Sequence, residues 1–67
     1  MKHLVGTTPM DFDTAVAIRF SDGRRLAAVY KDTYGYNHVF QTEDGKSITL
    51  SNHFMRLKGI RVEKEES

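Results

Sequence analysis

Residues 14–31 read TAVAIRFSDGRRLAAVYK and carry the pattern that decides the fold. Val16, Ile18 and Phe20 alternate with smaller or polar residues, and this period of two is typical of a half-buried β-strand. Ser-Asp-Gly at 21–23 predicts a turn, because glycine adopts positive φ without steric cost. The strand after the turn is apolar on both faces near its middle, as expected where a strand bends between two halves of a small barrel.

Three more strands are predicted downstream, at about 38–42, at 46–51 and around 60–62. Glu-Asp-Gly at 43–45 is a second hairpin signal. Residues 51–57 break the alternation, and the serine or asparagine at the start of this segment can cap one turn of helix. The sequence therefore predicts an all-β fold, a small five-stranded SH3-like or Sm-like barrel with a short helical turn before the last strand.

The two ends of the chain lie outside this predicted barrel. In residues 1–13, Thr8 followed by Pro9 and Asp11 resembles a helix N-terminus, which predicts a short helix or irregular chain. Residues 14–62 form the predicted barrel domain. Residues 63–67 are almost entirely charged, and we expect them to be a frayed tail.

Size and composition narrow the class of protein. The chain has 67 residues, no cysteine and a formal net charge of +1, which fits one small domain without disulfides or cysteine-based metal sites. A core of this size leaves little stability in reserve, so a homo-oligomer is expected. No segment resembles a membrane span or a secretory signal, and the expected location is cytoplasmic.

Three segments resemble the Sm-like and Hfq-like family. Residues 16–24 are similar to its first strand and the following Asp-Gly-Arg turn, residues 32–40 to its Asp, aromatic and Asn segment, and residues 48–52 stand in the place of its second motif. Ala28 replaces the usual glycine of the bent strand, and Ser51-Asn52 replaces the common Arg-Gly. The resemblance implies a ring-forming, RNA-binding barrel, and an SH3-like barrel of another family is the alternative.

The most suggestive cluster in the sequence comprises Tyr34, Tyr36, Asn37 and His38. Aromatic rings stack on unpaired bases and an asparagine amide reads a base edge, so Tyr34, Tyr36 and Asn37 are candidates for RNA contact. By the resemblance, Tyr34 or Tyr36 stacks, Asn37 hydrogen-bonds to the base, and His53 contacts a base. Alternatively, the tyrosines close the open end of the barrel, Asn37 makes a turn, and His53 is partly buried against a backbone carbonyl.

Basic side chains complete the predicted site. The candidates for phosphate contacts are Arg24, Arg25, Lys31, Arg56, Lys58 and Arg61, along with Arg19 and Lys46. The predicted site takes Arg24, Arg56 and Lys58 from among them. Asp22, Asp32, Glu43 and Asp44 lie near several of the chain's cations, so a solvated surface of mixed charge is the alternative reading.

The sequence favours a binding module over an enzyme. His3, His38 and His53 match no metal-ligand spacing, and no catalytic arrangement or phosphate loop is visible, so neither a metal nor another cofactor is predicted. The first hypothesis is single-stranded RNA binding by an oligomeric barrel. The alternative is a protein-interaction module, a regulator or inhibitor of the kind that mobile elements encode, which uses a sheet edge and the tyrosine segment.

Overall fold

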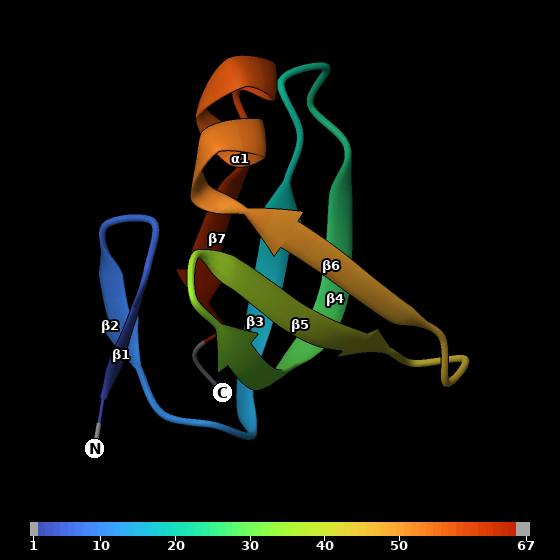
Figure 1. Ribbon diagram of the computed structural model, residues 1–67. Helices are drawn as coiled ribbons and strands as arrows, with labels where there is room; N and C mark the ends of the chain where they lie inside the picture. The colour runs from blue at the N-terminus through green and yellow to red at the C-terminus, as the bar shows by residue number, and fades with distance from the viewer. Residues whose placement is uncertain (1, 66–67) are drawn as a thin grey trace.

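The computed structural model describes residues 2–65, which fold mainly as β-structure with one small helix (Figure 1). Strands make up 58% and helix 11%, which confirms the predicted class. The elements are β1 (His3–Val5), β2 (Thr8–Met10), β3 (Thr14–Arg19), β4 (Arg25–Tyr34), β5 (Asn37–Thr42), β6 (Ser47–Ser51), α1 (Asn52–Lys58) and β7 (Arg61–Lys64).

Five of the strands form one antiparallel sheet in the order β6-β5-β4-β3-β7, as the alternating residues predict. The ten-residue β4 pairs with β3 through one part and with β5 through the other, and residues 28–30 pair with both. On the two faces of its middle, Ala28 and Tyr30 are buried and Ala27 and Val29 are partly buried, so both faces there are apolar. A register shift between Tyr30 and Asp32 accommodates one extra residue in the strand.

The prediction of a closed, five-stranded barrel is wrong in two respects. Within residues 2–65 there are seven strands, and the edges β6 and β7 do not pair with each other. Helix α1 carries the chain from one edge of the sheet to the other, and its Met55 side chain is buried. Side chains of Phe54 and Ile60, rather than backbone hydrogen bonds, therefore line the space between these edges.

Residues 3–10 form a β-hairpin, so the predicted short helix or irregular chain is wrong here. His3 pairs with Met10 and Val5 with Thr8, and Gly6 has a φ of 62° in the turn. Val5 and Met10 are 1% and 0% exposed, so burial of both ends in the core stabilises the hairpin over a helix. Pro9 is tolerated in this short two-stranded ribbon because an outer strand edge needs no N–H donor.

The predicted frayed tail is also wrong for residues 63–65. Strand β7 continues through Glu63 to Lys64, paired with β3, and Glu65 N–H donates to the carbonyl of Ala15 at 2.9 Å. Ladder hydrogen bonds therefore extend the order of the chain beyond its last buried residue, Val62. Residues 66 and 67 lie outside the described part of the chain.

The core lies between the sheet, the N-terminal hairpin and α1. It contains Val5, Met10, Val16, Ile18, Ala28, Tyr30, Phe40, Leu50, Met55 and Val62. The hairpin is anchored by rings: His3 stacks on Phe12 with centroids 4.3 Å apart, and Phe12 lies 5.4 Å from Tyr30. One polar side chain, His38, is buried with this core, and its hydrogen bonds lead to the candidate site.

Candidate functional site

A groove of about 590 Å³ runs between the N-terminal hairpin, α1 and β7. We call it the α1 groove. Its lining comprises Val5, Gly6, Thr7, Thr8, Asn52, Met55, Arg56, Ile60, Arg61, Val62 and Glu63. Backbone and side-chain polar groups alternate with apolar ones along it, so it offers both hydrogen bonds and contact surface to a ligand.

Helix α1 is short and is fixed at both ends by local sequence. Ser51 is the N-cap, and its hydroxyl accepts a hydrogen bond from Phe54 N–H at 3.0 Å. Gly59 ends the helix at a φ of 68°, and the N–H of Ile60 donates to the Met55 carbonyl at 2.8 Å. These caps set the orientation of Asn52 and Arg56 toward the groove.

Asn52 connects three elements of the fold at the end of the groove. Its Oδ1 accepts hydrogen bonds from Gly6 N–H at 3.2 Å and from His38 Nε2 at 2.8 Å. The donation by Gly6 fixes which end of the amide is the oxygen, so the His38 bond requires a proton on Nε2. No acceptor for Asn52 Nδ2 is found among residues 2–65, and this NH₂ group is not buried. Asn52 therefore presents a free donor at the groove.

A relay of side chains behind Asn52 holds it in place. His38, 1% exposed, accepts at Nδ1 from the Thr33 hydroxyl at 3.0 Å. Thr33 Oγ1 in turn accepts from the buried Tyr30 hydroxyl. In this series of hydrogen bonds every donor points in the same direction, from Tyr30 toward Asn52. Hydrogen bonds arranged in this way strengthen one another. The sheet thus positions the groove donor.

Positive charge at the groove is not neutralised by neighbouring carboxylates. Among residues 2–65, carboxylates within 4.0 Å accompany five cations: Arg19 with Glu63, Arg24 with Asp22, Arg25 with Glu65, Lys31 with Asp13, and Lys46 with Asp44. Arg56, Lys58 and Arg61 have no such partner in the described chain. The sequence shows why, since it has no Asp or Glu between Asp44 and Glu63.

One carboxylate, Glu63, does line the groove, and it lies 3.5 Å from Arg19 on the neighbouring strand. That pair is half exposed, so its attraction is weak and screened. Arg56 and Arg61 together still leave an excess of positive charge along this lining.

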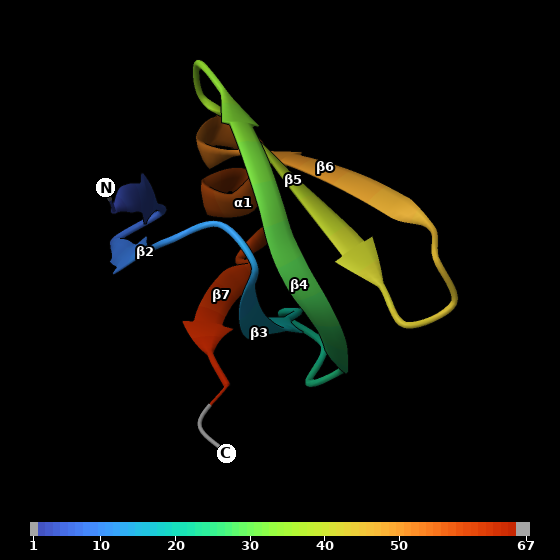
Figure 2. The same ribbon diagram turned by 90° about the horizontal axis from the view of Figure 1, so that it is seen from below.

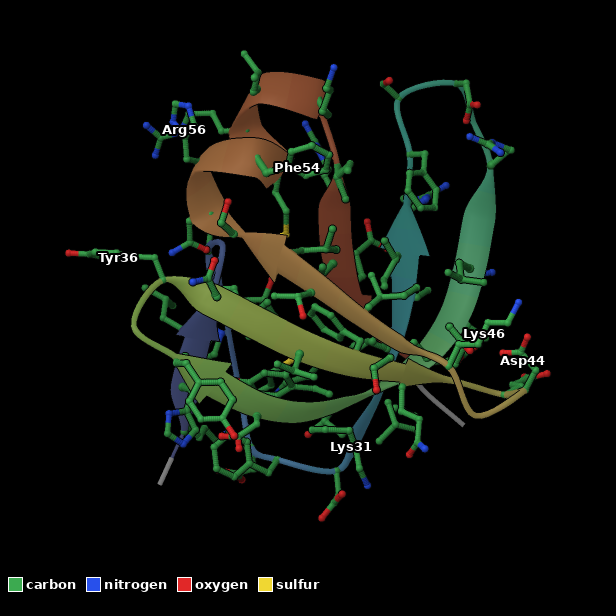
Figure 3. The ribbon with its side chains drawn as sticks, turned by 45° about the vertical axis from the view of Figure 1, so that its right-hand side comes forward. Lys31, Tyr36, Asp44, Lys46, Phe54 and Arg56 are labelled. Atoms are coloured by element: carbon green, nitrogen blue, oxygen red, sulfur yellow. The ribbon has the colours of Figure 1, made fainter. Side chains whose placement is uncertain are left out.

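Tyr36 stands at the helix end of the groove. Its carbonyl accepts a hydrogen bond from Asn52 N–H at 3.1 Å, which joins the β4–β5 turn to the start of α1. Its side chain is 78% exposed. Figure 3 shows Tyr36 and Arg56 projecting from the same side of the molecule. The exposed ring of Tyr36 and the guanidinium of Arg56, which has no carboxylate partner among residues 2–65, therefore lie on the same side of the molecule.

Tyr34 and Tyr36 differ in their surroundings, although the sequence predicts one role for both. Tyr34 ends β4 and its side chain is 65% exposed. The alternative prediction, that the tyrosine rings close the open end of a barrel, is therefore wrong for both rings. A hydrogen bond to the Asp32 carboxylate, together with its negative charge, raises the pKa of the Tyr34 hydroxyl. That carboxylate makes the surroundings of Tyr34 unfavourable for a phosphate backbone.

The tyrosine segment is a tight turn, since β4 ends at Tyr34 and β5 begins at Asn37. Asn37 opens β5, pairs with Tyr34 across the turn and with Ser51 on the other side. Its exposed side chain lies between these two neighbours at the sheet's end. His53 is exposed on α1, so the alternative of a partly buried histidine is wrong.

Arg24 and Lys58 lie elsewhere. They line a second pocket of about 300 Å³, whose apolar walls include Ile48 and Phe54. We call it the β6 pocket. Arg24 contacts Asp22 at 2.7 Å and lies over the Phe20 ring at 5.4 Å. The structure therefore brings Arg56 and Tyr36 together and separates Arg24 and Lys58 from them.

The structure also adds groups that the predicted site omits. Arg61, Asn52 and the backbone of Gly6 and Thr7 all line the α1 groove. The 18-residue stretch without an acidic residue, 45–62, is the sequence signal that points to Arg61. Nothing in the sequence places Gly6 beside Asn52, because that contact depends on docking of the hairpin.

Other site classes find no support in the described chain. Residues 2–65 contain no group of three His, Cys, Asp or Glu side chains arranged to hold a metal ion. No described helix has the length and apolar character needed to cross a bilayer. Comparisons of the chain with known protein families, with curated proteins and with solved structures find no match.

Proposed function

We propose that the protein is a non-enzymatic binding module for single-stranded RNA and that the α1 groove is its binding surface. The observation that carries the proposal is the gathering of uncompensated donors at one groove. Arg56, Arg61 and the Asn52 amide line it, whereas five of the other cations among residues 2–65 each have a carboxylate within 4.0 Å. Such donors suit the phosphates of a nucleic-acid backbone.

Tyr36 supplies the base contact in this proposal. Its ring is 78% exposed beside the helix end of the groove, where a base unstacked from its neighbours has access to it. Base–aromatic stacking contributes about 1–3 kcal/mol per base. Double-stranded RNA hides its bases from such a ring, so single strands are the expected ligand. The Sm-like resemblance supports the same ligand class.

The test is a fluorescence-anisotropy titration with labelled 12-nucleotide oligouridylate and oligoadenylate across a range of KCl concentrations. We expect the wild type to bind one or both with an affinity that falls as salt rises, because phosphate binding releases counterions. Arg56→Gln and Arg61→Gln should each weaken binding and reduce the slope of log K against log[salt] by about 0.7. Tyr36→Ala should weaken binding without changing the slope.

Matched controls separate the groove from surface charge in general. Arg24→Gln removes an exposed arginine that is paired with Asp22 in the β3–β4 turn. Tyr34→Ala removes an exposed ring next to Asp32. Both should leave affinity unchanged. Equal losses from groove and control variants, or no binding by the wild type at low salt, would contradict the proposal.

A further inference from the structure

Strand β6 is an edge of the sheet, and two hydrogen bonds show which of its backbone groups are free. Thr42 N–H donates to the Lys46 carbonyl, and Asn52 N–H donates to the Tyr36 carbonyl, at 2.8 and 3.1 Å. Both bonds use even-numbered residues at the ends of the β5–β6 ladder. Because hydrogen-bonded pairs alternate along an antiparallel ladder, the even-numbered residues of β6 face β5.

The odd-numbered residues Ser47, Thr49 and Ser51 therefore direct their N–H and C=O groups to the free edge. Nothing within β6 discourages another strand from pairing there, since Ser-Ile-Thr-Leu-Ser has no charge and no proline, and its register with β5 has no bulge. At the opposite edge of the sheet, the Val62 carbonyl already accepts from the Thr8 hydroxyl of the N-terminal hairpin at 3.4 Å.

The hairpin of β5 and β6 projects away from the rest of the sheet in two perpendicular views (Figures 1 and 2). Its tip carries Glu43, Asp44 and Lys46. Lys46 accompanies Asp44, whereas Glu43 has no cation partner among residues 2–65, so the tip has one excess negative charge. The other end of β6 leads into α1, which carries basic residues and no acidic one. The two ends of this edge are therefore opposite in charge.

We propose that a second copy of this chain pairs with β6 along its free edge, to give a two-fold symmetric dimer. The free backbone N–H and C=O groups of the odd-numbered residues in one copy must hydrogen-bond to those of the odd-numbered residues in the other. Antiparallel pairing of β6 with β6 of the second copy meets this requirement when Thr49 lies on the two-fold axis. Ser47 of one copy then pairs with Ser51 of the other. This register uses the full length of the strand.

The same register aligns opposite charges and apolar surfaces. Because antiparallel partners run in opposite directions, the Glu43–Asp44 turn of each copy lies toward the end of β6 in the other, where Lys58 of α1 lines the β6 pocket. Ile48 of each copy lies opposite Leu50 of the other, on the face where Phe54 is 42% exposed. Leu50 is itself buried, so the partly exposed Ile48 and Phe54 supply the accessible apolar surface. The α1 groove is lined by other elements, so RNA binding and dimer formation use separate surfaces.

The first test is solution mass by light scattering after size-exclusion chromatography. We expect the wild type to show twice the 7.7 kDa mass of one chain at about 100 μM and to dissociate on dilution. Thr49→Lys places two like charges opposite each other on the axis and should give single-chain mass, as should Thr49→Glu. A mixture of the two variants should recover the doubled mass. Gln41→Lys, a control at an exposed site on the interior strand β5, should remain dimeric.

The second test uses the absence of cysteine from the chain. Thr49→Cys places two thiols directly opposite each other on the axis, within the span of a disulfide, and mild oxidation should link two chains. Ser47→Cys thiols are four residues apart across the axis, about 13 Å, and should not link. A wild type of single-chain mass, a larger assembly, a dimeric Thr49→Lys, or equal linking by both cysteine variants would each overturn the proposal.

Discussion

Asn52 offers the sharpest separation of structural from binding roles. In Asn52→Ala, the Nε2–H group of His38, a residue that is 1% exposed in the wild type, loses its acceptor, and Gly6 N–H loses a partner that water can replace. A buried donor without an acceptor costs about 1–3 kcal/mol. We expect a loss of about 2 kcal/mol in the free energy of unfolding, a large part of the about 3–5 kcal/mol that a domain of this size has.

Asn52→Asp is the matched variant. A carboxylate keeps the acceptor for His38 and Gly6 and stands at the start of α1, where negative charge is favourable, so stability should be retained. It also removes the free amide donor and adds a negative charge to the groove, so RNA affinity should fall. Urea unfolding followed by circular dichroism, together with anisotropy titration, measures both quantities. An Asn52→Ala protein within about 0.5 kcal/mol of wild type would refute the relay.

Three further predictions concern turns and caps. Gly59→Ala should lower the free energy of unfolding by about 1–2 kcal/mol in urea denaturation, since φ is 68° and the added Cβ would lie 3.2 Å from Ser21 Cβ. Ser51→Ala should cost about 1 kcal/mol in the same assay through loss of the helix cap. Hydrogen bonds from Arg24 N–H and the Thr42 hydroxyl lower the pKa of Asp22 and Asp44, respectively, below 3.8, so these carboxylates stabilise the fold above that pH. Stability should fall with pH below about 4, and an NMR titration that found either carboxyl pKa above 3.8 would contradict this.

Strands in the central sheet were predictable because burial on one face imposes a period of two. Val16 and Ile18 mark β3, and glycine marks each hairpin turn between β3 and β6. Ser51 signals the helix cap. The same alternation places His38 on the face of Phe40, and the structure buries both.

The N-terminal hairpin was not predictable by this route. Its strands have three residues each, too few to show a period, and Thr8-Pro9 is equally typical of a helix start. What selects the hairpin is the burial of Val5 and Met10 against a core assembled from later residues. The alternating sequence pattern also could not show whether β6 and β7 pair to close the sheet into a barrel, because that depends on where α1 packs.

The candidate site was predictable in residue type but not in grouping. The exposed Tyr36 and the basic Arg56 were both expected to bind. Arg56 lines the α1 groove, and the Tyr36 carbonyl is hydrogen-bonded to Asn52, which also lines it. Tertiary contacts decide which cations have a carboxylate partner. Arg19, for example, contacts Glu63, which is 44 positions away in the sequence. The sequence offers Arg24 and Arg61 alike as candidate cations. The structure pairs Arg24 with Asp22 and places no carboxylate of residues 2–65 within 4.0 Å of Arg61.

The proposal that the α1 groove binds RNA is tested most directly by NMR chemical-shift mapping of ¹⁵N-labelled protein titrated with oligouridylate or oligoadenylate. The largest shifts should fall on backbone amides of Gly6 and Thr7, of Tyr36, of Asn52–Arg56, and of Arg61. Shifts that cluster instead around the β6 pocket and the edge of β6, or no shifts at low salt, would contradict the assignment of the α1 groove as the RNA-binding surface.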